Sequence, residues 1–312
     1  MRSDLLHVVT VINNPMRWAT RNKLFLQFVH HMLESGVNLT IVECAYGDIP
    51  HLHADLARLD PSGKRLRHVA VHAKTHLWIK ENLINIGLQN LPAGWKYVAW
   101  VDADITFRRR DWAEAAVYAL QHYDVIQPWS DCYDLGPNGE HVGHHLSFGR
   151  NWVEKPECIG RGAPYEFSHP GYAWAATRRA LEAVGGLIET AALGAGDHHM
   201  ALALVNKARH SMPGWISKAY ERPIFAWQDR AQHHIAGNLG YVPGTIEHGW
   251  HGTKASRQYI SRWDILMQHG FDPDVDLKRN LHGVLELAGN KPELKRAITA
   301  YFSSRNEDRN CL

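Results

Sequence analysis

The sequence predicts an α/β fold with a mixed, mostly parallel sheet that is flanked by helices. Short segments rich in β-branched residues alternate with amphipathic segments over the first 130 residues, which is typical of parallel sheets covered on both faces. The chain of 312 residues is long enough for one large domain of this class. Its hydrophobic fraction of 45% and charged fraction of 21% are those of an ordinary soluble globular protein.

The N-terminal part carries strand and helix patterns in turn. Apolar segments bounded by turn residues predict strands at 6–12, 37–44, 66–71, 97–101 and 124–127. Amphipathic periodicity predicts helices at 21–34, 77–89 and 111–122. Gly36 follows the first of these helices, where a glycine commonly ends a helix.

The C-terminal half has a less regular pattern. Residues 135–170 are rich in glycine, proline and histidine, and we expect a functional loop or a pair of irregular strands there. The remaining patterns predict helices at 177–184, 197–208, 255–269, 277–287 and 291–302, and strands at 215–220 and 239–246. We therefore expect one domain over residues 1–268, followed by a helical C-terminal extension over residues 269–312.

Charge and cysteine content narrow the possible partners and compartments. With 34 Lys and Arg against 32 Asp and Glu, the net charge of +2 favours neither nucleic acid nor membrane as a partner. Four scattered cysteines, without a C-x-x-C pair, argue against a disulfide framework and a zinc–thiolate site. No segment approaches the ~18 apolar residues of a membrane span, and no signal-peptide core is present. These observations predict a soluble, cytoplasmic protein.

An acidic pair, Asp102 and Asp104, directly follows the apolar strand predicted at 97–101. Ligands of parallel sheets bind beyond the carboxyl ends of the strands. Two carboxylates held close together are costly without a cation between them, and Mn²⁺ or Mg²⁺ bridging to a diphosphate would be a suitable partner. The alternative is a turn in which the acids make local hydrogen bonds to the backbone.

This D-x-D arrangement resembles that of the GT-A glycosyltransferases, which have a Rossmann-like fold and use nucleotide-sugar donors. The resemblance extends over roughly residues 5–260 and depends on motif order and spacing. It implies that Asp104 is a direct metal ligand, with Asp102 nearer the ribose of the donor and the water shell of the metal. Mn²⁺ or Mg²⁺ is the implied cofactor, and a UDP-sugar is the implied donor.

A second acidic site follows a glycine-containing segment at 171–174 and a predicted helix. The segment 194–199 resembles the GT-A loop that delivers an acidic residue to the start of a helix. Asp197 is the predicted general base, because a carboxylate at a helix N-terminus is held ionised. The family usually has two acids here, whereas this chain has Asp197-His198, so the base is either Asp197 or His198. Asp197 could instead only cap the helix.

Two histidines near the end of the domain complete the predicted metal site. The spacing His248-x-x-His251 resembles the Met-x-x-His of β-1,4-galactosyltransferases, which implies that His251 is a metal ligand and His248 a second one. Lys254 and Arg257 follow at a distance from which they could neutralise a diphosphate.

Other residues are predicted to contact the donor or the sugar rings from their positions in the chain. The predicted donor-binding residues follow the first strand or open the helix before the D-x-D strand: Asn14, Pro15, Arg17, Arg21, Lys80 and Asn85. The residues predicted to stack on acceptor or sugar rings are Tyr172, Trp174 and Trp215.

The function predicted from these motifs is metal-dependent transfer of a hexose or pentose to an acceptor hydroxyl, with inversion. The layout is similar to bacteriophage glycosyltransferases, which implies a modified DNA base as acceptor in the host cytoplasm; a glycan is the other acceptor considered. A nucleotidyltransferase is disfavoured because the loop after the first strand lacks glycine. A His-rich metallohydrolase is the second alternative, although the sequence lacks the H-E-x-x-H motif. A non-catalytic nucleotide- or sugar-binding module is the third.

Overall fold

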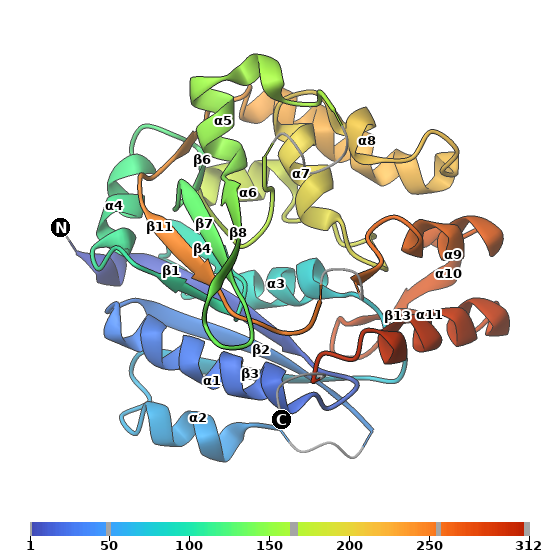
Figure 1. The fold of residues 1–312 in the computed structure, drawn as a ribbon, viewed down its shortest axis with the longest axis horizontal. Helices are drawn as coiled ribbons and strands as arrows, with labels where there is room; N and C mark the ends of the chain where they lie inside the picture. Colours follow the sequence, from blue (N-terminus) through green and yellow to red (C-terminus); the bar gives the residue numbers. More distant parts are fainter. Residues whose placement is uncertain (1, 48–50, 163–167, 254–256, 309–312) are drawn as a thin grey trace.

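The centre of the molecule is a mainly parallel sheet. The computed structural model describes residues 2–47, 51–162, 168–253 and 257–308. Among these, seven strands form one sheet in the order β10-β6-β9-β4-β1-β2-β3. Its neighbouring pairs are parallel except for the two that β9 makes with β4 and β6. The predicted fold class, a mixed and mostly parallel sheet flanked by helices, is confirmed (Figure 1).

This sheet contains the five strands expected in the first half of the chain and two strands from the second half. They are β1 (Leu6–Asn13), β2 (Asn38–Tyr46), β3 (Leu66–Ala73), β4 (Tyr97–Val101), β6 (Val125–Gln127), β9 (Ala173–Thr177) and β10 (Leu239–Tyr241). The helices are α1 (Ala19–Glu34), α2 (His53–Leu59), α3 (Lys80–Gln89), α4 (Trp112–Ala119), α5 (Phe148–Glu154), α6 (Arg178–Val184), α7 (Gly196–Leu204), α8 (Lys218–His234), α9 (Arg262–Gln268), α10 (Pro273–Asp276) and α11 (Pro292–Ser304).

Helices cover both faces of the sheet because alternate strand residues point to opposite sides. Val8 of β1 is buried in a core with α1, α2 and α4. Its neighbour Val9 is buried in a second core with α3, α6, α7 and α8. This alternation is the pattern of a sheet that is buried on both faces.

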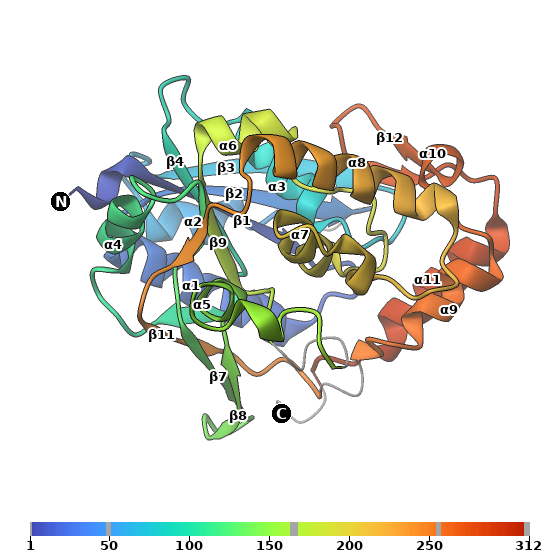
Figure 2. The ribbon, with the colours of Figure 1, turned by 90° about the horizontal axis from the view of Figure 1, so that it is seen from above.

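A second, four-stranded sheet lies beside the first and has the order β5-β11-β7-β8. Its strands are β5 (Ile105–Phe107), β7 (Asp131–Leu135), β8 (His141–Leu146) and β11 (Thr245–His248) (Figure 2). The segment predicted as a loop or irregular strands, 135–170, contains β8 and the helix α5. Strand β5 begins immediately after the D-x-D motif, and its pairing with β11 brings two distant parts of the chain together.

The predicted helix at 277–287 is wrong. Leu277–Arg279 (β12) and Leu285–Leu287 (β13) form an antiparallel hairpin instead. The connection favours a turn, because the Asn280 side chain accepts hydrogen bonds from His282 and Val284, and Gly283 has a φ of 77°. Residues 269–312 are therefore not purely helical.

Two further predictions near α8 and β10 are wrong in their boundaries or type. The strand expected at 215–220 is the start of α8, because the Ser217 side chain caps this helix by accepting from Tyr220 N. The strand expected at 239–246 is divided between β10 and β11, which belong to different sheets and flank Pro243. The described part of the helix expected at 255–269 is limited to α9.

The described residues 269–308 pack on α3 and share its core. Leu285 N donates to Asn82 Oδ1 at 2.9 Å, and Leu294 and Phe302 share one hydrophobic core with α3. Helices α9, α10 and α11 lie together at one end of the molecule (Figure 1). Among the described residues, none of the helices has the length and apolar character needed to cross a bilayer.

Candidate active site

A cavity of about 340 Å³ lies at the carboxyl ends of β1 and β4. Asn13 ends β1, the D-x-D motif follows β4, and Tyr172 precedes β9. Asp102 N donates to Tyr172 O at 2.7 Å, which fixes two of these segments against each other. The polar and charged residues that line the cavity are Asn13, Arg21, Lys80, Asp102, Asp104, His145, His169, Tyr172, Asp197, His248, His251, Tyr259, Arg257, Arg262 and Arg305.

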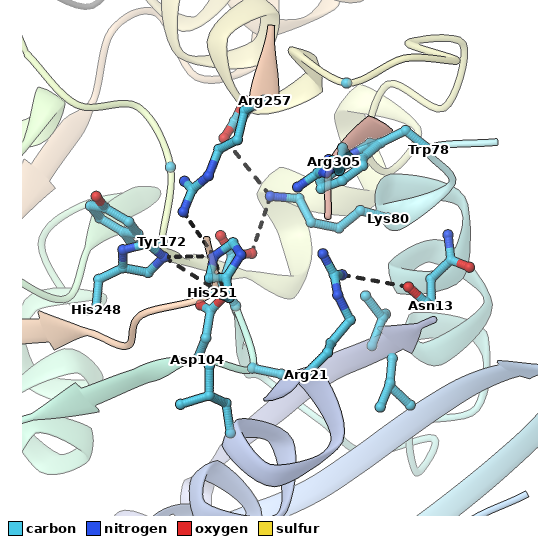
Figure 3. Close-up of a pocket in the computed structure, with 18 of the residues that line it drawn as sticks. Asn13, Arg21, Trp78, Lys80, Asp104, Tyr172, His248, His251, Arg257 and Arg305 are labelled. Atoms are coloured by element: carbon cyan, nitrogen blue, oxygen red, sulfur yellow. Dashed lines mark hydrogen bonds and ion pairs between the residues drawn. The ribbon is translucent and has the colours of Figure 1, made fainter. Parts of the chain in front are cut away.

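Asp104, His248 and His251 converge in this cavity (Figure 3). Asp104 Oδ2 lies 3.2 Å from His251 Nε2 and 3.7 Å from His248 Nε2. The Asp104 Oδ1 atom is buried and makes no hydrogen bond to the described residues. The register of β11 against β5 pairs His248 with Ile105, so this histidine is brought beside the D-x-D motif. The arrangement offers one carboxylate and two imidazoles to a metal ion.

A carboxylate that the sequence analysis missed holds His248 in place. Asp134 Oδ1 lies 2.9 Å from His248 Nδ1 and accepts from the Tyr172 hydroxyl at 2.9 Å. Asp134 Oδ2 lies 2.8 Å from His145 Nε2. A carboxylate on the second ring nitrogen of a ligating histidine orients the ring and raises its basicity. Asp134 lies on β7, and the parallel pairing of β7 with β11 places it opposite His248. The sequence around Asp134 does not indicate this contact.

The histidines and Asp104 affect each other's protonation. Burial opposes ionisation of Asp104, but His248 and His251 outweigh it and hold the pKa of Asp104 well below its ordinary value. Burial opposes protonation of His248, but Asp104 and Asp134 raise its pKa above the ordinary value. The cluster therefore stabilises an ionised carboxylate beside a cationic group.

Lys80 lies between the carboxylates of this cavity. Its Nζ is 3.1 Å from Asp102 Oδ1, 3.8 Å from Asp197 Oδ2 and 4.0 Å from Glu81 Oε1. Burial opposes the charge of Lys80, but the surrounding acids raise its pKa. Burial raises the pKa of Asp102; Lys80 opposes this rise, whereas Asp104 adds to it. Asp102 is thus paired with an ammonium group and does not belong to the group of three potential metal ligands.

Asp197 lies in the first turn of α7 and lines the cavity. Burial opposes its ionisation, but Lys80 and His169 outweigh it and lower the pKa of Asp197. A Cβ atom at Gly171 would lie 2.9 Å from Asp197 Oδ2 and 3.0 Å from His169 Cε1. Only glycine at position 171 leaves the carboxylate and the imidazole this close to the backbone.

Of two histidines near Asp197, the predicted His198 lies outside the cavity, whereas His169, which was not predicted, lines it. His198 is buried and does not line the cavity, and burial lowers its pKa to about 4. His169 lines the cavity and stacks on Tyr172 with ring centroids 4.0 Å apart. Its Nδ1 accepts from Gly171 N at 3.1 Å, and burial lowers its pKa well below the ordinary value. In the sequence, its place just before Pro170-Gly171 was the available indication.

Arginines form part of the cavity wall, and one of them contacts a predicted metal ligand (Figure 3). Arg257 Nη2 lies 3.1 Å from His251 Nε2. Arg21 makes two hydrogen bonds to the Glu307 carboxylate, at 2.9 and 2.7 Å, and Arg305 lies 2.8 Å from the same group. Arg305 also lies over the Trp78 ring, 4.9 Å from its centroid. Local sequence did not predict that Arg305 and Glu307, near the C-terminal end of the described chain, belong to the site.

Three residues predicted to bind the donor do not line the cavity. The Asn14 side chain bonds to Trp18 and Asn22 and so shapes the turn before α1. Asn85 bonds to the backbone of Leu187 on the other side of α3. Arg17 is exposed and does not line the cavity.

Other predicted residues also lie away from the cavity. Pro15 is buried beside Asn14, and Trp174 donates to Pro170 O within the core. Trp215 has 47% of its surface exposed and lies outside the cavity lining. Lys254 lies outside the described residues. Of the predicted aromatic contacts, Tyr172 lies in the cavity.

Comparisons with known proteins give matches at the level of structure. No family model and no curated protein sequence matches the chain. The chain is similar to a mannosyltransferase from Pyrobaculum calidifontis in complex with GDP-Man and Mn²⁺, at 16% identity and a TM-score of 0.47, over 98% of this chain and 71% of that one. S. aureus TarS matches at 13% identity and a TM-score of 0.44, over 98% and 71% of the two chains.

A mutant Drosophila β-1,4-galactosyltransferase 7 in complex with manganese, UDP-Gal and xylobiose also matches. Its identity is 14% and its TM-score 0.35, over 65% of this chain and 61% of that one. Glycosyltransferases with a nucleotide sugar and manganese are therefore among the similar structures, and they are the class that the sequence motifs resemble. At these TM-scores, the functional assignment depends on the residues of the cavity.

Proposed function

We propose that this protein is a metal-dependent GT-A glycosyltransferase that moves a sugar from a nucleotide-sugar donor, a UDP-sugar, to an acceptor hydroxyl. One observation carries the proposal. A carboxylate–histidine cluster and a wall of cationic side chains line one cavity at the carboxyl edge of the sheet. Cations beside a metal ion repel the ion itself, whereas they complement the negative charge of a metal-bound diphosphate.

The residues of the cluster fit a divalent ion. Asp104, His248 and His251 would hold it, and the buried Asp104 Oδ1 atom without a described hydrogen-bond partner supports this assignment. Mixed oxygen and imidazole ligands suit Mn²⁺ better than Mg²⁺, which prefers oxygen ligands. When bound, the ion acts as a Lewis acid that stabilises negative charge on the leaving diphosphate.

The cationic wall provides the second part of the site. Lys80, Arg21 and Arg257 lie on different sides of the cavity and present charged groups into it (Figure 3). Such groups orient a diphosphate and favour the charge that develops when the sugar leaves. Glu307 forms ion pairs with Arg21 and Arg305 at the edge of this wall.

Asp197 is the proposed general base. Its lowered pKa keeps it ionised at neutral pH, and it lies in the cavity beside Lys80. It accepts the acceptor proton as the hydroxyl oxygen attacks the anomeric carbon from the side opposite the leaving group, which inverts the configuration. His198, the other candidate base, is buried and does not line the cavity, so Asp197 is the base that we propose.

The direct test is Mn²⁺-dependent turnover of a panel of nucleotide sugars by the purified protein. Release of the nucleoside diphosphate is followed with and without EDTA, in the presence of glycan or modified-DNA acceptors. Turnover that requires one UDP-sugar and Mn²⁺ supports the proposal. Binding without turnover on any acceptor would indicate a binding module, and hydrolysis of substrates without a nucleotide would indicate a metallohydrolase.

Asp197→Asn tests the role of the base. We expect kcat to fall by about 10²–10⁴-fold, with Mn²⁺-dependent donor binding retained, since this is the usual contribution of general base catalysis. Asp111→Asn is the matched control, because Asp111 is exposed and bonds to Arg109 away from the cavity. Unchanged kcat, or a product with retained configuration, would contradict the assignment of Asp197.

A further inference from the structure

A second histidine–carboxylate cluster lies between β2, β3 and the start of α2. Glu43 on β2 lies 2.8 Å from His68 Nε2 of β3 and 3.4 Å from His51 Nδ1, each measured to its Oε2 atom. One potential ligand atom from each of these three side chains lies within 4.8 Å of the others. None of the three lines the candidate active site.

Two more histidines hold the rings of this cluster. His53 Nδ1 lies 2.9 Å from His68 Nδ1, and His72 Nε2 lies 3.1 Å from His51 Nε2. The rings of His51 and His68 therefore each direct one nitrogen toward Glu43. The other nitrogen of each ring is held by an outer histidine, which is His72 for His51 and His53 for His68. This is the arrangement of a metal-ligating histidine whose second ring nitrogen is fixed by a neighbouring group.

The protonation of the rings is compatible with a metal. If His51 and His68 donate their outer N–H groups to His72 and His53, each keeps a lone pair on the nitrogen nearest Glu43. A metal ion requires such unprotonated nitrogens and an ionised carboxylate. The His51 Nδ1 atom is buried, lies 3.4 Å from Glu43 Oε2 and makes no hydrogen bond to the described residues, as expected of a nitrogen placed for an ion.

The carboxylate is preorganised as well. Leu52 N donates to both oxygens of Glu43, at 3.2 and 2.9 Å, which fixes the side chain beside the start of α2. Bond lengths of about 2.0–2.2 Å to a tetrahedral zinc ion place neighbouring ligand atoms about 3.3 Å apart. The 3.4 Å contact from Glu43 Oε2 to His51 Nδ1 is close to that spacing, and the 2.8 Å contact to His68 Nε2 is a hydrogen bond that an ion would replace.

We propose that Glu43, His51 and His68 form a second metal site, which takes Zn²⁺ and is distinct from the cavity that contains Asp104. Two imidazoles and one carboxylate suit Zn²⁺ and leave a position for water. His53 and His72 are positioning residues that orient the ligand rings. The site is independent of the proposed glycosyltransferase activity, because it shares no residue with the cavity.

The test is a metal titration in which the other cluster is disabled. Asp104→Asn/His251→Asn protein is stripped with EDTA, dialysed and titrated with Zn²⁺ by calorimetry, and with Co²⁺ by visible absorption. We expect one equivalent of Zn²⁺ to bind, with a tetrahedral Co²⁺ spectrum. Absence of a bound equivalent would overturn the proposal.

Substitutions in the second cluster locate the bound ion. Adding His51→Asn/His68→Asn should weaken Zn²⁺ binding by at least about 100-fold, beyond the loss typical of supporting residues. His30→Asn is the matched control, since His30 lies 3.4 Å from Glu34 in a histidine–carboxylate pair on an exposed helix face. Unchanged Zn²⁺ affinity in the cluster variant would overturn the proposal.

A third set of variants tests the site if the double variant does not fold. His53→Asn and His72→Asn change exposed side chains, and each should weaken Zn²⁺ binding by about 10–100-fold. Circular dichroism without metal should match the parent protein. Zn²⁺ affinity that neither substitution alters would contradict the role of the outer histidines and overturn the assignment of the site.

Discussion

The two histidine–carboxylate clusters contain the same types of ligand but have different surroundings. Asp104 and its two histidines lie in a cavity that Lys80 and several arginines also line. Glu43 is instead surrounded by histidines and by the backbone N–H of Leu52. The first cluster can share an ion with an anionic ligand, whereas the second is suited to hold an ion by itself.

The comparison shows that ligand type alone does not assign a role to a metal site. An ion held by one carboxylate and two imidazoles can stabilise a leaving group only where a substrate can reach it and cations complement the charge of that substrate. In this protein, Arg21 of α1, Lys80 of α3 and the arginines at positions 257, 262 and 305 supply these cations. The following predictions test the difference between the two clusters.

The largest expected effect is that of Asp104→Asn. This substitution removes the carboxylate shared by both histidines of the first cluster, and we expect Mn²⁺-dependent turnover to fall by about 10³-fold. The Zn²⁺ equivalent at Glu43 should remain, since the two sites share no ligand. Turnover with Mn²⁺ and parallel Zn²⁺ calorimetry measure the two effects, and Asp111→Asn is the control. Loss of both metal sites together would show that the clusters are not separate.

Glu307→Gln tests the cationic wall that distinguishes the first cluster. The Glu307 carboxylate is buried and bonds to Arg21 and Arg305, so its loss leaves two guanidinium groups poorly paired. We expect the free energy of unfolding to fall by about 3 kcal/mol, as for other broken buried ion pairs. Denaturant unfolding measures the change. Glu293→Gln, which affects an exposed pair with Arg296, should change it by less than about 1 kcal/mol.

The stabilisation by Glu307 should also depend on pH. Burial opposes its ionisation, but Arg21 and His251 outweigh it and lower the pKa of Glu307 well below the ordinary value. A lowered carboxyl pKa contributes stability that is present above the unfolded pKa and lost as the pH falls toward the folded pKa. The difference between wild type and Glu307→Gln should therefore shrink in acid. A difference that stayed constant down to pH 3 would contradict the ion-pair explanation.

The smallest expected effect is a difference in the pH dependence of metal binding. The pKa of His248 is raised, so below this raised value an ion must displace a proton, and Mn²⁺ affinity should increase about tenfold per pH unit. Burial lowers the pKa of His51, so this ring needs no deprotonation at neutral pH. Zn²⁺ affinity at the second cluster should therefore change less between pH 6.5 and 8. Calorimetry in buffers of different ionisation enthalpy measures the protons released, and equal release at both sites would contradict this prediction.

The sequence by itself predicted the parallel sheet and the position of the D-x-D motif at its carboxyl edge. Strand β4 has the bounds expected from its apolar run, and Asp102 and Asp104 both line the cavity. These features are local, because periodicity and turn residues act over short stretches of chain. His248 and His251 could be predicted as ligands because only two residues separate them and the family resemblance implied this role.

Tertiary structure decided the features that depend on distant residues. Asp134 reaches His248 through strand pairing, Glu307 reaches Arg21 across 286 positions, and Glu43 meets His68 across 25. The hairpin at 277–287 was mistaken for a helix because its leucines fit both periods, and only the turn at Asn280 and its packing on α3 distinguish the two. Short-range patterns specify the elements, whereas the buried charges of both clusters find their partners only when the chain has folded.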